Sequence, residues 1–181
     1  MRNAAQVDVR EEENENISSR KLEKILKVAE SQKRQEKTKE IKFRLVENYN
    51  ESGDLEKALE LLEPEYNSDP KNIELANILV DIYEKQNKEN QALEVLNTAL
   101  DISFEQEDLE NASSLLIRKE NFLTEKPEDW EQIGKEFLQS GVAEKADNAY
   151  AKAASLYENN SNLELASEMV DARLSIDPAN I

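Results

Sequence analysis

Apolar residues recur at helical spacing near the start of the chain, with polar residues between them. The first such stretch holds four apolar residues three or four positions apart, Leu22, Ile25, Leu26 and Ala29. Ser18 or Ser19 precedes this stretch and can cap a helix. Between Glu30 and Glu40 the apolar stripe vanishes, but the residues are good helix formers with opposite charges three or four positions apart. We expect one helix over residues 18–40, amphipathic at first and then solvated.

The residues before this helix are polar and acidic. Glu11, Glu12, Glu13 and Glu15 lie there, and only Val7 and Val9 could anchor the segment to a core. The sequence therefore predicts a flexible acidic arm over residues 1–17.

An internal repeat begins at about residue 39. A shift of 34 positions carries four residues of one copy, Leu45, Tyr49, Ala58 and Leu62, onto Leu79, Tyr83, Ala92 and Leu96. Each copy has two helical stretches, separated by a break at residues 52–54 or 86–88. Pro70 closes the first copy, because proline has no N–H group with which to continue a helix. Each copy is therefore predicted to be a helix-turn-helix.

The repeated residues resemble the tetratricopeptide repeat, in which large, small and aromatic residues occupy fixed positions of two helices. The first two copies match at Leu45, Val46, Tyr49, Gly53, Ala58, Leu62 and Pro70, and at Leu79, Val80, Tyr83, Ala92, Leu96 and Ala99. A later stretch matches best, at Trp130, Ile133, Gly134, Phe137, Gly141, Ala146, Tyr150 and Ala153. The resemblance implies an all-α, right-handed superhelix (a solenoid) of about four helix-turn-helix repeats over residues 41–181, with an N-terminal helical extension.

The phase of the later repeats has two solutions. The segment from Ala143 to Glu158 fits as the second helix of the Trp130 copy and equally as the first helix of the copy that ends at Pro178. Four helical stretches follow the second copy, near 108–124, 128–139, 143–158 and 163–176. Four helices make two pairs, so we expect a third repeat that pairs the first two stretches and a fourth that begins near 143. The pattern would begin another helix at Ile181, so we also expect that a terminal capping helix is missing.

Composition excludes most enzyme chemistry. The 181 residues include no cysteine and no histidine, which removes thiolate and imidazole nucleophiles, histidine bases and common zinc sites. The three glycines do not form a phosphate-binding loop, and no acidic run has the pattern of a calcium loop. Carboxylates such as Asp129 and Glu131 are better explained as solvated helix faces. We expect no enzyme, no catalytic residue, no metal and no cofactor.

The net charge of the chain limits the kinds of partner that it can bind. The formal net charge is −17, which disfavours binding to nucleic acid. The stretch from Arg20 to Lys39 is the exception, with eight basic and three acidic residues. Neither an apolar run long enough for a membrane span nor a signal-peptide core is visible, so we expect little membrane contact and a cytoplasmic location.

In tetratricopeptide arrays, ligands bind in a concave groove lined by the first helix of each repeat. The resemblance places eight residues there: Glu40, Phe43, Glu47, Asn50, Glu74, Asn77, Asp81 and Glu84. Five of the eight are acidic, which favours a basic or amphipathic peptide, although any face of so acidic a chain would look similar. The carboxylate clamp of co-chaperones is absent, because Phe43, Glu47 and Ile78 stand where the clamp has Lys, Asn and Asn.

Two functions follow as hypotheses. The first is a non-catalytic adaptor that binds a basic or amphipathic peptide of a protein partner in this acidic groove and supports assembly of a larger complex. The alternative is a structural subunit that packs edge to edge or forms a homo-oligomer, with the basic N-terminal helix docking on the acidic array.

Overall fold

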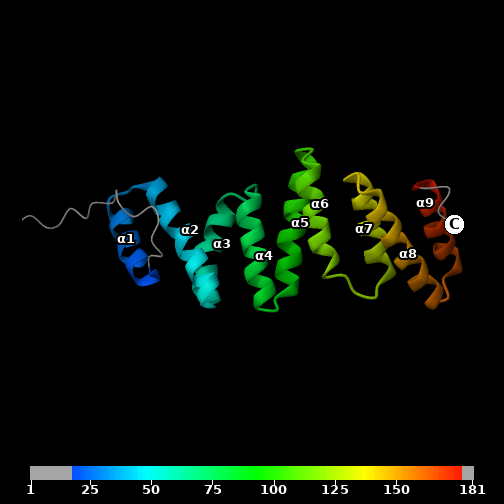
Figure 1. Cartoon of the computed structure of the whole chain (residues 1–181), viewed down its shortest axis with the longest axis horizontal. Helices are drawn as coiled ribbons and strands as arrows, with labels where there is room; N and C mark the ends of the chain where they lie inside the picture. The colour runs from blue at the N-terminus through cyan, green and yellow to red at the C-terminus, as the bar shows by residue number, and fades with distance from the viewer. Residues whose placement is uncertain (1–17, 177–181) are drawn as a thin grey trace, which may run out of the picture. The chain divides into compact units, whose positions relative to one another are not determined.

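The computed structural model describes residues 18–176, and within this range the chain is all α-helical (Figure 1). The expected breaks near residues 52–54 and 86–88 are confirmed, because helices end at Ser52 and Lys85. The expected acidic arm, residues 1–17, lies outside the described residues. The helices are α1 (Ser19–Ser31), α2 (Gln35–Ser52), α3 (Leu55–Ser68), α4 (Ile73–Lys85), α5 (Glu89–Glu105), α6 (Leu109–Glu120), α7 (Pro127–Gln139), α8 (Ala143–Asn159) and α9 (Leu163–Ile176).

We had expected one helix over residues 18–40, but the structure divides this segment between α1 and α2. It is divided by a tight turn at Gln32, Lys33 and Arg34, in which Lys33 has a positive φ of 52°. The backbone N–H of Arg34 donates to the carbonyl of Ala29 at 3.1 Å and closes α1. The turn lets α2 fold back on α1 and bury its apolar stripe, so α1 is a packed member of the array.

The helices recur in groups of three at a constant interval. Helices α1, α4 and α7 begin at residues 19, 73 and 127; α2, α5 and α8 begin at 35, 89 and 143; α3, α6 and α9 begin at 55, 109 and 163. The interval between successive starts is the same in all three series, and we call it the three-helix period. We call α1–α3, α4–α6 and α7–α9 the first, second and third three-helix repeats.

The turns follow the same period. Between residues 18 and 176, six turn residues have positive φ: Lys33, Gly53, Asn87, Glu107, Gly141 and Ser161. Successive turns are separated alternately by a smaller and a larger number of residues. The larger separation is 34 residues, the same as the shift found in the sequence. That shift is therefore one part of the three-helix period. After five of the six, the next residue donates its N–H to a carbonyl five residues earlier, as in Lys88 to Tyr83 at 2.9 Å. This is the bond that closes a Schellman helix end.

The packing of α8 settles the repeat phase. Helix α8 packs extensively on both α7 and α9, whereas α6 makes only slight contact with α7 and packs on α5 instead. The expected pairing of the 108–124 stretch with the Trp130 helix is therefore wrong. Helix α8 serves as the second member of one pair and the first member of the next, because it is the middle helix of a three-helix repeat.

The chain divides into two compact units, the first ending at Pro64 and the second beginning at Glu65. Each has its own apolar core: Leu45 and Val46 are 2% exposed or less in the first, and Leu96, Leu116 and Phe137 are fully buried in the second. Among the described residues, no helix is long and apolar enough to cross a membrane. The handedness of the superhelix and the domain boundary at residue 40 stay predictions.

Candidate binding surface

Helix α4 carries four of the eight expected groove residues on one side. Asn72 caps this helix by accepting a hydrogen bond from the N–H of Leu75 at 3.1 Å, which sets where the helix begins. Leu79, Val80 and Ile82 are buried. The helical period then places the remaining face towards solvent, with Glu74 exposed and a stripe of three half-buried residues, Asn77, Asp81 and Glu84.

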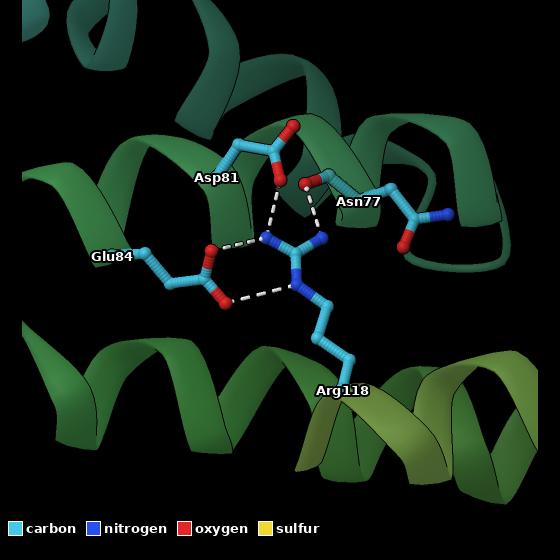
Figure 2. Close-up of polar contacts among 4 residues, drawn as sticks. All are labelled: Asn77, Asp81, Glu84 and Arg118. Atoms are coloured by element: carbon cyan, nitrogen blue, oxygen red, sulfur yellow. Dashed lines mark hydrogen bonds and ion pairs between the residues drawn. The ribbon is translucent and has the colours of Figure 1, made fainter. Parts of the chain in front are cut away.

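Arg118 of α6 lies on this stripe and contacts all three residues (Figure 2). Its Nε and Nη2 atoms donate to the two carboxylate oxygens of Glu84 at 3.0 and 2.8 Å. Nη2 also donates to Oδ1 of Asp81, and Nη1 donates to the backbone carbonyl of Asn77 at 3.2 Å. The face of α4 thus forms a guanidinium site, with one bidentate carboxylate, a second carboxylate and a carbonyl.

Burial and charge act in opposite directions on Arg118. Burial alone would lower its pKa, but the hydrogen bond with Glu84 and the charges of Asp81 and Glu84 raise it above the ordinary value. The Arg118 side chain is 19% exposed, whereas those of Asp81 and Glu84 are 49% and 35% exposed. The carboxylates therefore remain accessible to solvent while they bind this cation.

The two residues that follow Arg118 extend the polar contacts to other helices. Lys119 pairs with Glu136 of α7 at 2.9 Å, and both side chains are less than one-fifth exposed. Glu120 accepts from Lys145 of α8 at 2.7 Å. The end of α6 is thus held to α4, α7 and α8 by charged groups, although α6 and α7 make only slight contact with each other.

The other four expected groove residues lie on α2, in the first compact unit. Glu40 is exposed and pairs with Lys37 on its own helix at 3.1 Å. Glu47 is exposed, and Phe43 and Asn50 are half-buried. The assignment of these four residues to a groove stays a prediction.

A pocket of about 240 Å³ lies in the same unit, among α1, α2 and α3. Three leucines, Leu26, Leu45 and Leu61, and charged side chains including Lys27 and Lys57 line it. The Tyr49 hydroxyl donates to Glu23 in its wall at 2.5 Å. The expected groove residues do not line this pocket.

The family comparison decides what kind of repeat this is. The family model described as tetratricopeptide repeat matches residues 49–116. This segment carries tetratricopeptide repeats. It includes all of α4, with Asn77, Asp81 and Glu84, and ends two residues before Arg118. The resemblance inferred from the sequence is confirmed. Tetratricopeptide repeats generally serve as protein–protein interaction modules and are typically not catalytic.

Two solved structures titled "Crystal structure of MamA protein" and "Crystal structure of MamA" are similar to this chain, each at 18% identity. The first alignment covers 76% of this chain and 91% of the other, with a TM-score of 0.33. The second covers 74% and 95%, with a TM-score of 0.30. Comparison with curated proteins found no match.

Sequence reasoning found the acidic stripe of the tetratricopeptide segment but missed the cation that binds it. Arg118 lies 34 residues after Glu84, on the third helix of the same three-helix repeat. The sequence analysis assigned groove residues only to α2 and α4, so it did not consider Arg118 on α6 as a partner of this stripe.

Proposed function

We propose that this protein is a non-catalytic adaptor that binds a basic segment of a protein partner on the stripe formed by Asn77, Asp81 and Glu84. The observation that carries the proposal is the guanidinium site on α4, which binds Arg118 through both oxygens of Glu84 and through Asp81. A partner arginine presents the same planar group and the same donors.

Arg118 then acts as an internal competitor for this site. A partner arginine has to replace it, which lowers the affinity for an isolated peptide. Exchange is feasible, because the side chains of Asp81 and Glu84 are 49% and 35% exposed and can be reached by a cation from solvent. The proposal therefore predicts weak binding by the wild-type chain and tighter binding when Arg118 is removed.

Fluorescence anisotropy with a labelled, arginine-containing peptide tests this at low salt. Arg118→Ala should bind the peptide about tenfold more tightly than the wild type, since the competitor is gone. Glu84→Gln in the Arg118→Ala background should abolish that gain, because the amide keeps the size of the side chain but loses its charge.

Glu94→Gln is the matched control, because Glu94 is an exposed acidic residue on α5. This variant should bind as the wild type does. Equal losses in Glu84→Gln and Glu94→Gln would mean that only the overall charge attracts the peptide. No gain in Arg118→Ala would also contradict the proposal.

A further inference from the structure

The first and last described helices each expose an apolar stripe. On α1, Val28 is 53% exposed and Ile25, one turn earlier, is half-buried. On α9, Leu163 is 71% exposed and Val170, two turns later, is 42% exposed. We call Ile25 with Val28 the α1 end face, and Leu163 with Val170 the α9 end face.

The three-helix repeat shows that both end faces include interior positions. One three-helix period carries Val28 onto Ile82, which is fully buried, and Ile25 onto Leu79, which is 2% exposed. Val170 is the counterpart of Leu116, which is also fully buried. Leu163 is more open than its counterpart Leu109, which is 45% exposed. Helical arrays bury such positions by stacking one repeat on the next.

The two end faces differ in charge. Helix α1 has four basic and two acidic residues, whereas α9 has three acidic residues and one basic residue. The difference extends to the surrounding chain. Residues 18–64 contain 11 basic and ten acidic side chains, whereas residues 65–176 contain ten basic and 24 acidic side chains. An α1 end face of one molecule is therefore attracted to the α9 end face of another, and two identical ends are not.

We propose that copies of this chain associate head to tail, with the α1 end face of one copy packed on the α9 end face of the next. Ile25 and Val28 then take the place of a following helix against Val170. Two different surfaces meet in this contact, so each added copy leaves one free face of each kind and longer assemblies grow as concentration rises. The contact is separate from the proposed ligand site on α4.

Complementary variants of the full chain test the orientation. Val28→Gln damages only the α1 end face, and Val170→Gln damages only the α9 end face. Both side chains are more than two-fifths exposed, so neither change disturbs a core. Light scattering over a range of concentrations should show assembly of the wild type and a monomer of 20.7 kDa for each variant alone. Each substitution should weaken association about tenfold or more.

An equimolar mixture of the two variants tests whether the contact is head to tail. The intact α9 end face of the Val28→Gln copy and the intact α1 end face of the Val170→Gln copy should form a dimer of twice the chain mass and nothing larger. Leu138→Gln, a change of similar exposure on α7, is the control and should assemble as the wild type does.

Three results would overturn the proposal. The first is a wild-type monomer at every concentration, and the second is assembly of either variant as strong as that of the wild type. The third is a mixture that stays monomeric. None of these three results would alter the peptide binding expected on α4. The proposal of head-to-tail association can therefore be contradicted while the proposed peptide binding stands.

Discussion

The hydroxyl group of Tyr157 in α8 donates a hydrogen bond of 2.9 Å to Oε2 of Glu131 in α7. Tyr49 of α2 makes the same bond to Glu23 of α1 at 2.5 Å, and both pairs are 26 residues apart. Each tyrosine is 5% exposed or less. In the first and third three-helix repeats, the first helix is therefore tied to the middle helix by the same hydrogen bond, from a tyrosine hydroxyl to a half-buried carboxylate.

Replacing Tyr157 with phenylalanine should destabilise the chain by about 1 to 2 kcal/mol, because the bond is largely shielded from solvent and its acceptor is charged. Glu131 keeps its second partner, Lys135, at 2.6 Å, so its charge is not left unpaired. Chemical denaturation measures the change. Tyr150→Phe is the control, since Tyr150 is equally buried but its pKa is raised mainly by burial, without the contribution of a hydrogen bond to a carboxylate. Equal losses in the two variants would contradict a specific role for the hydrogen bond.

Stability should fall at high pH because of the same tyrosines. Burial, followed by the hydrogen bond to the glutamate, raises the pKa of both Tyr49 and Tyr157 from 10.0 to about 12. The unfolded chain releases these protons at lower pH than the folded chain does. The stabilisation is thus complete below pH 10.0 and is lost as pH rises towards about 12.

The measurement is the free energy of unfolding across this range, together with tyrosinate absorption of the folded chain. The double variant Tyr49→Phe, Tyr157→Phe should show a flatter dependence on pH. An unchanged slope would mean that other groups control alkaline unfolding.

Gly134 of α7 is required by the close approach of α8. A Cβ atom at this position would lie 2.8 Å from Cε1 of Tyr150 and 3.0 Å from Cδ1, and both are ring atoms of a buried side chain. Alanine favours a helix over glycine by about 1 kcal/mol, but overpacking costs about 1 to 3 kcal/mol.

Gly134→Ala should therefore lower stability despite the gain in helix propensity. In a Tyr150→Leu background, which removes the ring, the same change should be neutral or stabilising. Denaturation of the four proteins of this double-mutant cycle measures the coupling, and additive effects would exclude the contact as the cause.

Glu107 is a turn residue whose backbone conformation disfavours its side chain. It has a φ of 58°, whereas the equivalent turn one three-helix repeat earlier has glycine, Gly53, at 81°. Glu107→Gly should stabilise the chain by roughly 0.5 to 1 kcal/mol, because glycine adopts positive φ without steric penalty.

The reverse change gives a matched test of this conformational effect. Gly141 has a φ of 82°, and a Cβ placed there would meet no atom within 4 Å. Gly141→Ala should destabilise by about 1 kcal/mol through backbone conformation alone. Thermal unfolding reports both changes, and a loss of stability in Glu107→Gly would contradict the argument.

Helix positions and most of the core could be predicted from periodicity, because local spacing determines which side a residue faces. Leu45, Tyr49, Leu79 and Tyr83 are buried as the repeat implies. The break at Lys33 was missed because good helix formers surround it, and only the packing of α2 on α1 makes the turn favourable. The match at Trp130 indicated the correct pairing of α7 with α8. The phase was nevertheless assigned wrongly, because the later helices were counted in pairs where the chain repeats in threes.

The candidate site was predicted only in part. The acidic stripe of α4 follows from the helical period, so Asn77, Asp81 and Glu84 could be grouped from the sequence. The contact with Arg118 depends on how α6 lies beside α4, and local spacing does not determine that relationship. The pairing of Lys119 with Glu136 was missed for the same reason, since α6 and α7 are joined by a longer connection.

The tyrosine–glutamate pair distinguishes the first and third three-helix repeats from the second. One three-helix period after Glu23 and Tyr49 the chain has Asn77 and Ser103, and the Ser103 hydroxyl donates to the carbonyl of Ala99 instead. Both partners of the pair lie within one repeat, so duplication of the first or third repeat would copy the hydrogen bond intact. A chain lengthened by copies of these repeats would gain one such bond with each copy, whereas one lengthened by copies of the second repeat would gain none.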